Sequence, residues 1–153
     1  MKKLLIIGGA IVAVFILIAV LSNQSNKAKL KDNPYGTDKL SQLTIGLIGN
    51  ENYNNIVQPD VLNKKINSGK SVTAYYFSPD CQYCMAMTPV LMPIAKEMGV
   101  DVLQYNMMEF PHPDDVKSWP TLVHYKDGKE VGRMAGEQPA ENIRAFFTEF
   151  EGK

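Results

Sequence analysis

Cysteine is scarce in this 153-residue sequence: there are two, Cys81 and Cys84, and they lie three positions apart. A disulfide-stapled fold needs more cysteines at wider spacing, because the stabilisation from a bridge grows with the length of chain that it closes. A bridge across two intervening residues would constrain the unfolded chain very little. We therefore interpret the pair as a chemical centre rather than a structural staple.

Histidine is equally scarce, and neither sign of charge is in excess. Sixteen basic residues balance sixteen acidic ones, so nothing in the charge indicates nucleic acid as a partner. A zinc site needs about four ligands, and besides the cysteines the sequence offers His112 and His124, which lie far apart along the chain. Haem attachment needs a histidine directly after the second cysteine, where Met85 stands. The methionine-rich stretch is better explained as core or groove lining than as copper ligands, so we expect neither a metal nor a dissociable cofactor.

The one long apolar run lies at the N-terminus. A short basic head, residues 1–3, precedes residues 4–21, which are uncharged and apolar. At about 1.5 Å per residue this run spans roughly 27 Å, close to the thickness of a hydrocarbon core. A secretory signal peptide has a similar form, but the cleavage signal before Ser22 is weak. We therefore predict a retained transmembrane anchor at residues 4–21, with a cleaved signal as the alternative.

The orientation of this anchor follows from its form more than from its charge. A very short basic head before an apolar run is typical of export, whereas Lys27, Lys29 and Lys31 lie on the other side and nearly cancel the charge bias. We expect a single-pass protein of the cell membrane with its folded domain on the extracytoplasmic side. An anchored exported domain also suggests a Gram-positive bacterium.

Beyond the anchor the sequence predicts a linker and one folded domain. Residues 22–39 are polar and contain a turn signal around Pro34, so they are predicted to be a linker. Residues 40–153 are predicted to form an α/β domain with a central mixed β-sheet flanked by helices. Apolar periodicity and turn residues place strands at 71–78, 100–105, 121–125 and 130–134, and helices at 59–69, 81–98 and 139–150.

The two cysteines fall where the first predicted strand gives way to a helix. At a helix N-terminus the unpaired N–H groups and the macrodipole favour an anion. A thiolate is such an anion, so we expect the pKa of Cys81 to lie below the free value of about 8.5. Cys84 lies about one helical turn further on and deeper, from where it can attack a mixed disulfide formed on Cys81.

This setting resembles the thioredoxin family over about residues 58–150. The Cys-x-x-Cys pair follows a buried strand, Pro89 stands where the family has a helix-kinking proline, and Gly136 matches a late glycine of the family. Trp119-Pro120-Thr121 matches the cis-proline tripeptide. The resemblance implies a thioredoxin-like fold with Cys81 as the attacking and Cys84 as the resolving residue, and with Trp119, Pro120 and Thr121 shaping the groove for the substrate chain.

The sequence departs from the family pattern around the cysteines. Asp80 stands where cytoplasmic thioredoxins have tryptophan, and Tyr75 where they have a buried aspartate that deprotonates the second cysteine. Tyrosine titrates near 10 and cannot accept that proton at neutral pH. The dipeptide Gln82-Tyr83 is neither that of thioredoxins nor that of strong bacterial oxidants. In the family this dipeptide tunes the reduction potential, and Asp80 adds a negative charge next to Cys81 that opposes the helix dipole, so the direction of electron flow stays open.

The resemblance implies a thiol-disulfide oxidoreductase. Its expected partners are protein substrates with thiols or disulfides, a second dithiol oxidoreductase that supplies or removes electrons, and the membrane through residues 4–21. The disulfide of Cys81 and Cys84 would be its only redox group. A non-catalytic thioredoxin-fold module that binds exported proteins is the alternative.

Overall fold

The computed structural model describes residues 2–152, which form two compact units divided between Asn33 and Pro34. The first unit is one helix, α1 (Lys2–Lys31), of 30 residues. Between Ile7 and Lys31 the most apolar window of 18 residues has a mean hydropathy of 2.1. No part of that window is buried. A helix of this length and composition is compatible with a membrane span, and a signal sequence has the same properties.

The structure revises the predicted linker of residues 22–39. Its first part, to Lys31, continues α1, because residues 22–31 contain neither glycine nor proline and include several good helix formers. Its last part belongs to the second unit. Tyr35 is buried there and its ring lies 5.6 Å from that of Phe110. Few residues are therefore left to act as a linker, around Asp32 and Asn33.

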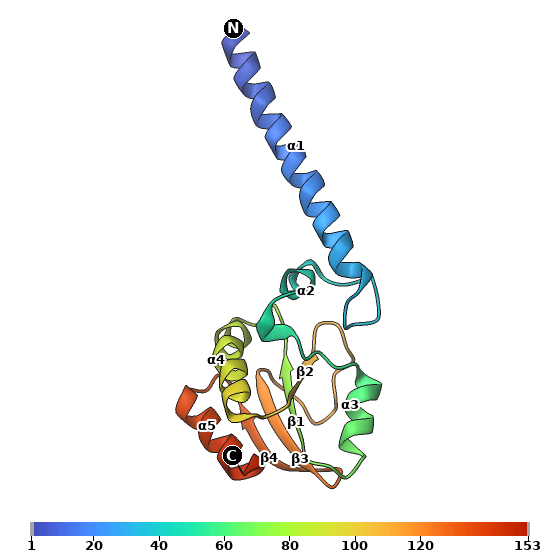
Figure 1. The fold of residues 1–153 in the computed structure, drawn as a ribbon, viewed down its shortest axis with the longest axis vertical. Helices are drawn as coiled ribbons and strands as arrows, with labels where there is room; N and C mark the ends of the chain where they lie inside the picture. The colour runs from blue at the N-terminus through green and yellow to red at the C-terminus, as the bar shows by residue number, and fades with distance from the viewer. Residues whose placement is uncertain (1, 153) are drawn as a thin grey trace. The chain divides into compact units, whose positions relative to one another are not determined.

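The second unit is built on a four-stranded sheet with the order β2-β1-β3-β4 (Figure 1). The first pair, β1 and β2, is parallel, whereas β3 is antiparallel to both β1 and β4, so the sheet is mixed as predicted. The strands are β1 (Val72–Phe77), β2 (Val102–Asn106), β3 (Thr121–Lys126) and β4 (Lys129–Ala135). Asp127 and Gly128, both with positive φ, connect the last two strands in the predicted Asp-Gly hairpin.

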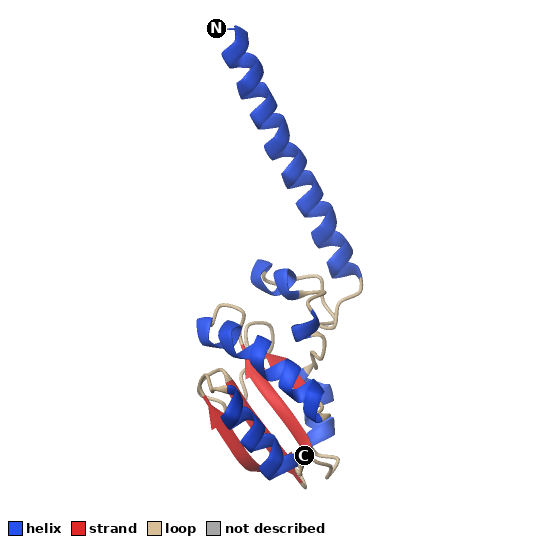
Figure 2. Cartoon of the chain, turned by 60° about the vertical axis from the view of Figure 1, so that its left-hand side comes forward, coloured by secondary structure: helices blue, strands red, loops and turns tan. Residues whose placement is uncertain are grey.

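Helices cover both faces of this sheet (Figures 1 and 2). On one face α4 (Gln82–Met98) and α5 (Ala140–Glu151) pack on Tyr75 and Phe77 of β1. On the other face α3 (Pro59–Ile66) packs through Leu62 on Ala74 and Tyr76. Because side chains alternate along a strand, the fully buried β1 supplies both cores.

Residues 34–48 pack against the end of β2 through buried polar contacts. Within this segment Ser41 caps the short helix α2 (Gln42–Leu47), and the 3₁₀ turn η1 (Glu51–Tyr53) follows the segment. Glu109 Oε1 accepts hydrogen bonds from the Ser41 N–H at 3.0 Å and the Thr44 hydroxyl at 2.5 Å. Asn106 Nδ2 donates to the hydroxyl of Tyr35 at 3.1 Å and to that of Thr44 at 3.3 Å. Because of these contacts the compact unit begins at Pro34, whereas the sequence predicted that it begins at residue 40.

Gly132 of β4 makes room for an aromatic ring. A Cβ at this position would lie 2.4–2.7 Å from three ring carbons of Phe150, which stacks on His124 in the next strand. We expect Gly132→Ala to lower the free energy of unfolding by about 1–3 kcal/mol, because the ring must move within a packed layer. Urea unfolding of residues 34–153 measures this. The control is Gly46→Ala, which meets no atom within 4 Å and should not destabilise the helix.

His124 gives the unit a pH-dependent stability. Its side chain is buried, and Thr73, whose hydroxyl donates to Glu151, accepts a hydrogen bond from Nδ1 at 2.8 Å. Nε2 has no hydrogen-bond partner among the described residues, so a proton placed on it would be buried without an acceptor. Burial lowers the pKa of His124, and this outweighs the opposing charge of Glu151.

A folded-state pKa below the unfolded value of about 6.5 means that the unfolded chain binds more protons as the pH falls. We therefore expect this contribution to be fully present above about pH 6.5 and to decline below it, by at most about 1.4 kcal/mol per pH unit. Urea unfolding between pH 5 and 8 measures the slope. In His124→Gln the slope in this window should become smaller, and an unchanged slope would contradict the assignment.

Candidate active site

Cys81 lies at the N-terminal end of α4, directly after the loop that follows β1. It is the N-cap residue of this helix, and its Sγ accepts a hydrogen bond from the N–H of Cys84 at 3.2 Å. Its own N–H donates to the carbonyl of Ser78 at 3.1 Å, which holds the loop closed. The side chain is partly exposed. A reactive sulfur is thus presented to solvent at the end of a helix that favours negative charge.

Cys84 lies one turn further along α4 and is fully buried, in the core cluster that contains Phe77. Both cysteines are free thiols in this structure. Burial raises the pKa of the Cys84 thiol far above its usual range, and a hydrogen bond with Cys81 acts in the same direction. A backbone hydrogen bond from Ser78 opposes the shift. Cys84 is therefore a neutral thiol at neutral pH, whereas Cys81 is open to a disulfide that approaches from solvent.

The turn that carries Trp119 and Pro120 lies beside Cys81. The thiol of Cys81 donates to the carbonyl of Trp119 at 3.5 Å, and the peptide bond between Trp119 and Pro120 is cis. The carbonyl of Pro120 accepts a hydrogen bond from the N–H of Gly136 at 2.8 Å, which joins the turn to the end of β4. Trp119 is half-buried and Pro120 is buried.

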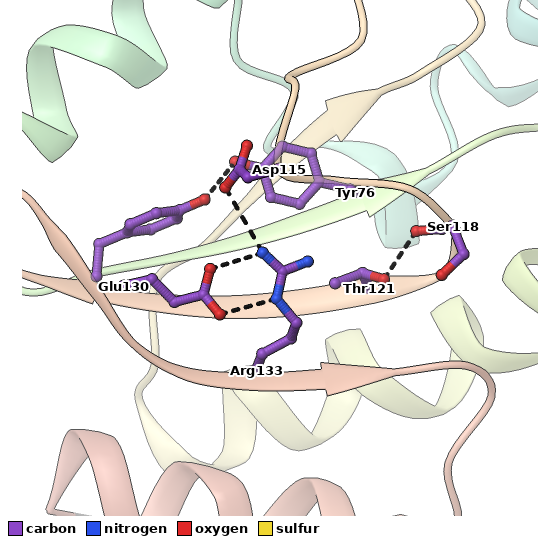
Figure 3. A network of polar contacts seen from close by, with 7 residues as sticks. Tyr76, Asp115, Ser118, Thr121, Glu130 and Arg133 are labelled. Carbon is purple, nitrogen blue, oxygen red and sulfur yellow. Dashed lines mark hydrogen bonds and ion pairs between the residues drawn. The ribbon is translucent and has the colours of Figure 1, made fainter.

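Thr121 differs from its two neighbours because its side chain faces inward. It is buried, and its hydroxyl donates to the carbonyl of Ser118 at 2.8 Å, which closes the turn from within (Figure 3). In the tripeptide that was predicted to bind the substrate, Pro120 and Thr121 are therefore buried and Trp119 has a partly exposed side chain.

A polar network holds the loop before this turn against β4. Arg133 pairs with both carboxylate oxygens of Glu130, at 2.8 and 2.6 Å, and also contacts Asp115 of the loop at 3.5 Å (Figure 3). The hydroxyls of Tyr76 and Tyr125 lie 2.9 Å apart in the same region. The guanidinium of Arg133 lowers the pKa of Glu130. The network links the sheet to the loop from which the turn with the cis-proline emerges.

His112 contacts the turn in a way that the sequence did not indicate. His112 lies at an exposed position in its loop, and its ring meets the ring of Trp119 edge-on at 5.1 Å. Its Nε2 is 2.7 Å from the carbonyl of Met107. Two flanking prolines restrict this loop, which was the only signal in the sequence. Among the described residues no group of three His, Cys, Asp or Glu side chains is placed to hold a metal ion.

The three residues predicted to tune the cysteines lie around Cys81 at exposed positions. Asp80 accepts a hydrogen bond from the hydroxyl of Ser78. Gln82 and Tyr83 begin α4. The side chain of Tyr83 is 55 % exposed and lines a largely apolar groove of about 780 Å³ with Val90 and residues 136–140. The groove therefore lies between the first part of α4 and residues 136–140, which precede α5.

Beneath Cys84 the structure places hydroxyl groups. The phenol of Tyr75 lies 3.1 Å from the hydroxyl of Thr88, which in turn donates to the carbonyl of Cys84 at 2.7 Å. Burial raises the pKa of Tyr75 well above its ordinary value. Tyr75 is therefore uncharged at neutral pH, as expected from its residue type.

The arrangement of sheet, cysteine pair and proline turn has counterparts in known proteins. Residues 50–149 match the family model for thioredoxin. The chain belongs to the thioredoxin family. A thioredoxin of Chlamydia muridarum is 36% identical over 92 residues, which are 58% of this chain and 89% of that protein. A thioredoxin of Staphylococcus aureus is 33% identical over 84 residues, covering 52% of this chain and 80% of that protein.

Solved thioredoxins have the same fold. A mutant thioredoxin from Halobacterium salinarum aligns with a TM-score of 0.54 at 22% identity, over 62% of this chain and 88% of that one. Thioredoxin from Malassezia sympodialis aligns with a TM-score of 0.55 at 19% identity, over 62% and 90%. The family match makes this chain a thioredoxin-type redox protein with thiol-disulfide oxidoreductase chemistry in the general sense. Both α1 and residues 34–49 lie outside the matched region.

Proposed function

We propose that this protein is a membrane-tethered thiol-disulfide oxidoreductase that exchanges disulfides with protein substrates through Cys81 and Cys84. The observation that carries the proposal is the unequal placement of the two sulfurs. Cys81 is partly exposed at a helix N-terminus and receives an N–H hydrogen bond, whereas Cys84 is fully buried one turn behind it. One sulfur is accessible to another protein, and the other can react only with the first.

The reductive half-reaction runs in two steps. The thiolate of Cys81 attacks a substrate disulfide, so that one substrate sulfur leaves as a thiolate and the other becomes bonded to Cys81. Cys84 then loses its proton and attacks Cys81, which forms the internal disulfide and releases the second substrate sulfur. The substrate chain lies along Trp119 and Pro120, and Thr121 supports that turn from within.

An insulin-reduction assay on the full chain in detergent, with a dithiol as the electron source, tests the enzymatic assignment. Catalysed turnover supports it, and turnover no faster than the dithiol alone would leave the non-catalytic binding module as the function. The reduction potential of the cysteine pair then gives the direction. A value near about −270 mV indicates a reductase, and one near about −120 mV an oxidant.

The tether is proposed to be α1, with the thioredoxin domain on the extracytoplasmic side. The apolar side chains between Ile7 and Leu21 are more than half exposed, and a continuous apolar surface of this size needs a cover such as a lipid bilayer. Alkaline phosphatase fused after Lys153 should be active in cells, because it folds only after export. The mass of the membrane-bound chain should include residues 1–21, and a mass that begins near Ser22 would show a cleaved signal instead.

A further inference from the structure

The second step of the proposed reaction requires Cys84 to lose a proton in a buried place. A thiol attacks a disulfide as its thiolate, so the proton must leave before the internal disulfide can form. The Cys84 side chain is 0% exposed, which keeps solvent bases away from it. The rate of this step therefore depends on the groups that surround Cys84.

Tyr53, Tyr75 and Thr88, which carry neutral hydroxyls, lie close to Cys84. The hydroxyl of Thr88 donates to the carbonyl of Cys84, so the phenol of Tyr75 is the donor in its 3.1 Å contact with Thr88. Tyr53 of η1 lies in the same core cluster and donates to the sulfur of Met85 at 3.5 Å. Burial raises the pKa of both Tyr53 and Tyr75. Each phenol thus holds its proton at neutral pH and has already used it in a hydrogen bond.

Two further titratable groups, Cys81 and Asp80, act on the pKa of Cys84 through their charge. In the mixed disulfide the sulfur of Cys81 is bonded to the substrate and accepts no proton. Asp80 is a carboxylate, but it lies at an exposed position and is held by the hydroxyl of Ser78. Its negative charge raises the pKa of Cys84. Through this charge Asp80 therefore opposes the loss of the proton from Cys84.

We propose that this hydroxyl-lined site makes release of the substrate the slow step, so that the disulfide between Cys81 and its substrate is the long-lived form of the enzyme. The inference rests on the proposed roles of the two cysteines. The proton of Cys84 passes to hydroxide or water during a transient opening of the site, the new thiolate attacks Cys81, the bond from Cys81 to the substrate breaks, and the substrate leaves as a thiolate. One disulfide is exchanged for another, and no further oxidant is needed.

The probe is 5,5′-dithiobis(2-nitrobenzoate), an aromatic disulfide whose thiolate product is coloured. With the reduced full chain in detergent, attack by Cys81 releases one thiolate and closure of the internal disulfide by Cys84 releases a second. Stopped-flow absorbance separates the phases, because the first rate depends on probe concentration and the second does not. We expect the second rate at pH 7 to be at least about tenfold below the first at saturating probe, and to rise about tenfold per pH unit from pH 7 to 9.

Two variants assign the proton acceptor. Tyr75→Phe should leave the second rate within about threefold of the original, and Tyr76→Phe, on the opposite face of β1, is its matched control. Asp80→Asn should speed the second phase about two- to threefold, because a charge that disfavours the Cys84 thiolate is removed. The amplitude of the first phase shows in each variant that the chain is folded and Cys81 is reactive.

A second phase that is fast and independent of pH between 6 and 8 would overturn the proposal. So would a loss of tenfold or more in the second rate, in Tyr75→Phe relative to Tyr76→Phe or in Asp80→Asn, because that residue would then be the proton acceptor. Failure of the proposed function looks different, since absence of the first phase in the original chain would mean that Cys81 is not the attacking residue.

Discussion

Replacing Cys81 with serine is expected to abolish catalysed insulin reduction. The hydroxyl of serine is a far weaker nucleophile than a thiolate, so the rate should fall to the uncatalysed background, a loss on the order of 10³-fold or more. The fold should persist, because the side chain is only partly buried and serine is a good N-cap residue. Urea unfolding alongside the assay separates loss of chemistry from loss of structure.

The matched variant is Cys84→Ser, which should also lose turnover but for a different reason. Its Cys81 still attacks, so the reduced variant should accumulate a mixed disulfide with the substrate, seen as a higher-mass band on non-reducing gels. Accumulation in Cys81→Ser instead of Cys84→Ser would reverse the two roles.

The largest expected effect on stability comes from Phe77→Ala. Phe77 ends β1, is fully buried, and contacts the rings of Tyr75 and Tyr53 at centroid distances of 5.8 and 5.4 Å. Removing its ring leaves a cavity in the core cluster that contains Cys84, and we expect a loss of about 3–5 kcal/mol in the free energy of unfolding. Because Phe77 directly precedes the loop to Cys81, activity should fall as well.

Urea unfolding of residues 34–153 measures this loss, with Leu43→Ala as the control. Leu43 is also a large apolar residue, but its side chain is 51 % exposed and it lies in a helix that accepts alanine. Its replacement should change the free energy of unfolding by less than about 0.5 kcal/mol. Equal losses in the two variants would contradict the assignment of Phe77 to the core.

The N-terminal part of the folded unit distinguishes this chain from the matched thioredoxins. Residues 34–48 precede the family match, yet they pack on the domain through Tyr35 and through the acceptors offered by Glu109. Burial raises the pKa of Tyr35 to about 12. Few residues are therefore left between the end of α1 at Lys31 and the start of the second unit at Pro34.

Much of the fold was predictable because the sequence signals were local. The β-branched and aromatic run at 71–78, the Asp-Gly turn at 127–128 and the apolar stripe of the last helix each specify an element by themselves. Their boundaries moved by one or two residues in the structure. The linker was misplaced because polar composition indicated exposure, whereas the burial of Tyr35 depends on Phe110 and Asn106, which lie some 70 positions later in the chain.

The sequence by itself determined the cysteine pair, its place between a strand and a helix, and the family to which the chain belongs. The pair is a local motif, since the spacing of Cys81 and Cys84 on one helical turn depends on nothing distant, and the family resemblance adds Pro89, Pro120 and Gly136, which can be read directly from the sequence. Tertiary structure alone decided how different the two sulfurs are. The burial of Cys84, the hydroxyls of Tyr75 and Thr88 beneath it, and the contact of Cys81 with Trp119 join segments far apart in sequence. Packing sets the environment of each thiol: it leaves the sulfur of Cys81 partly exposed and keeps the thiol proton of Cys84 in a buried place.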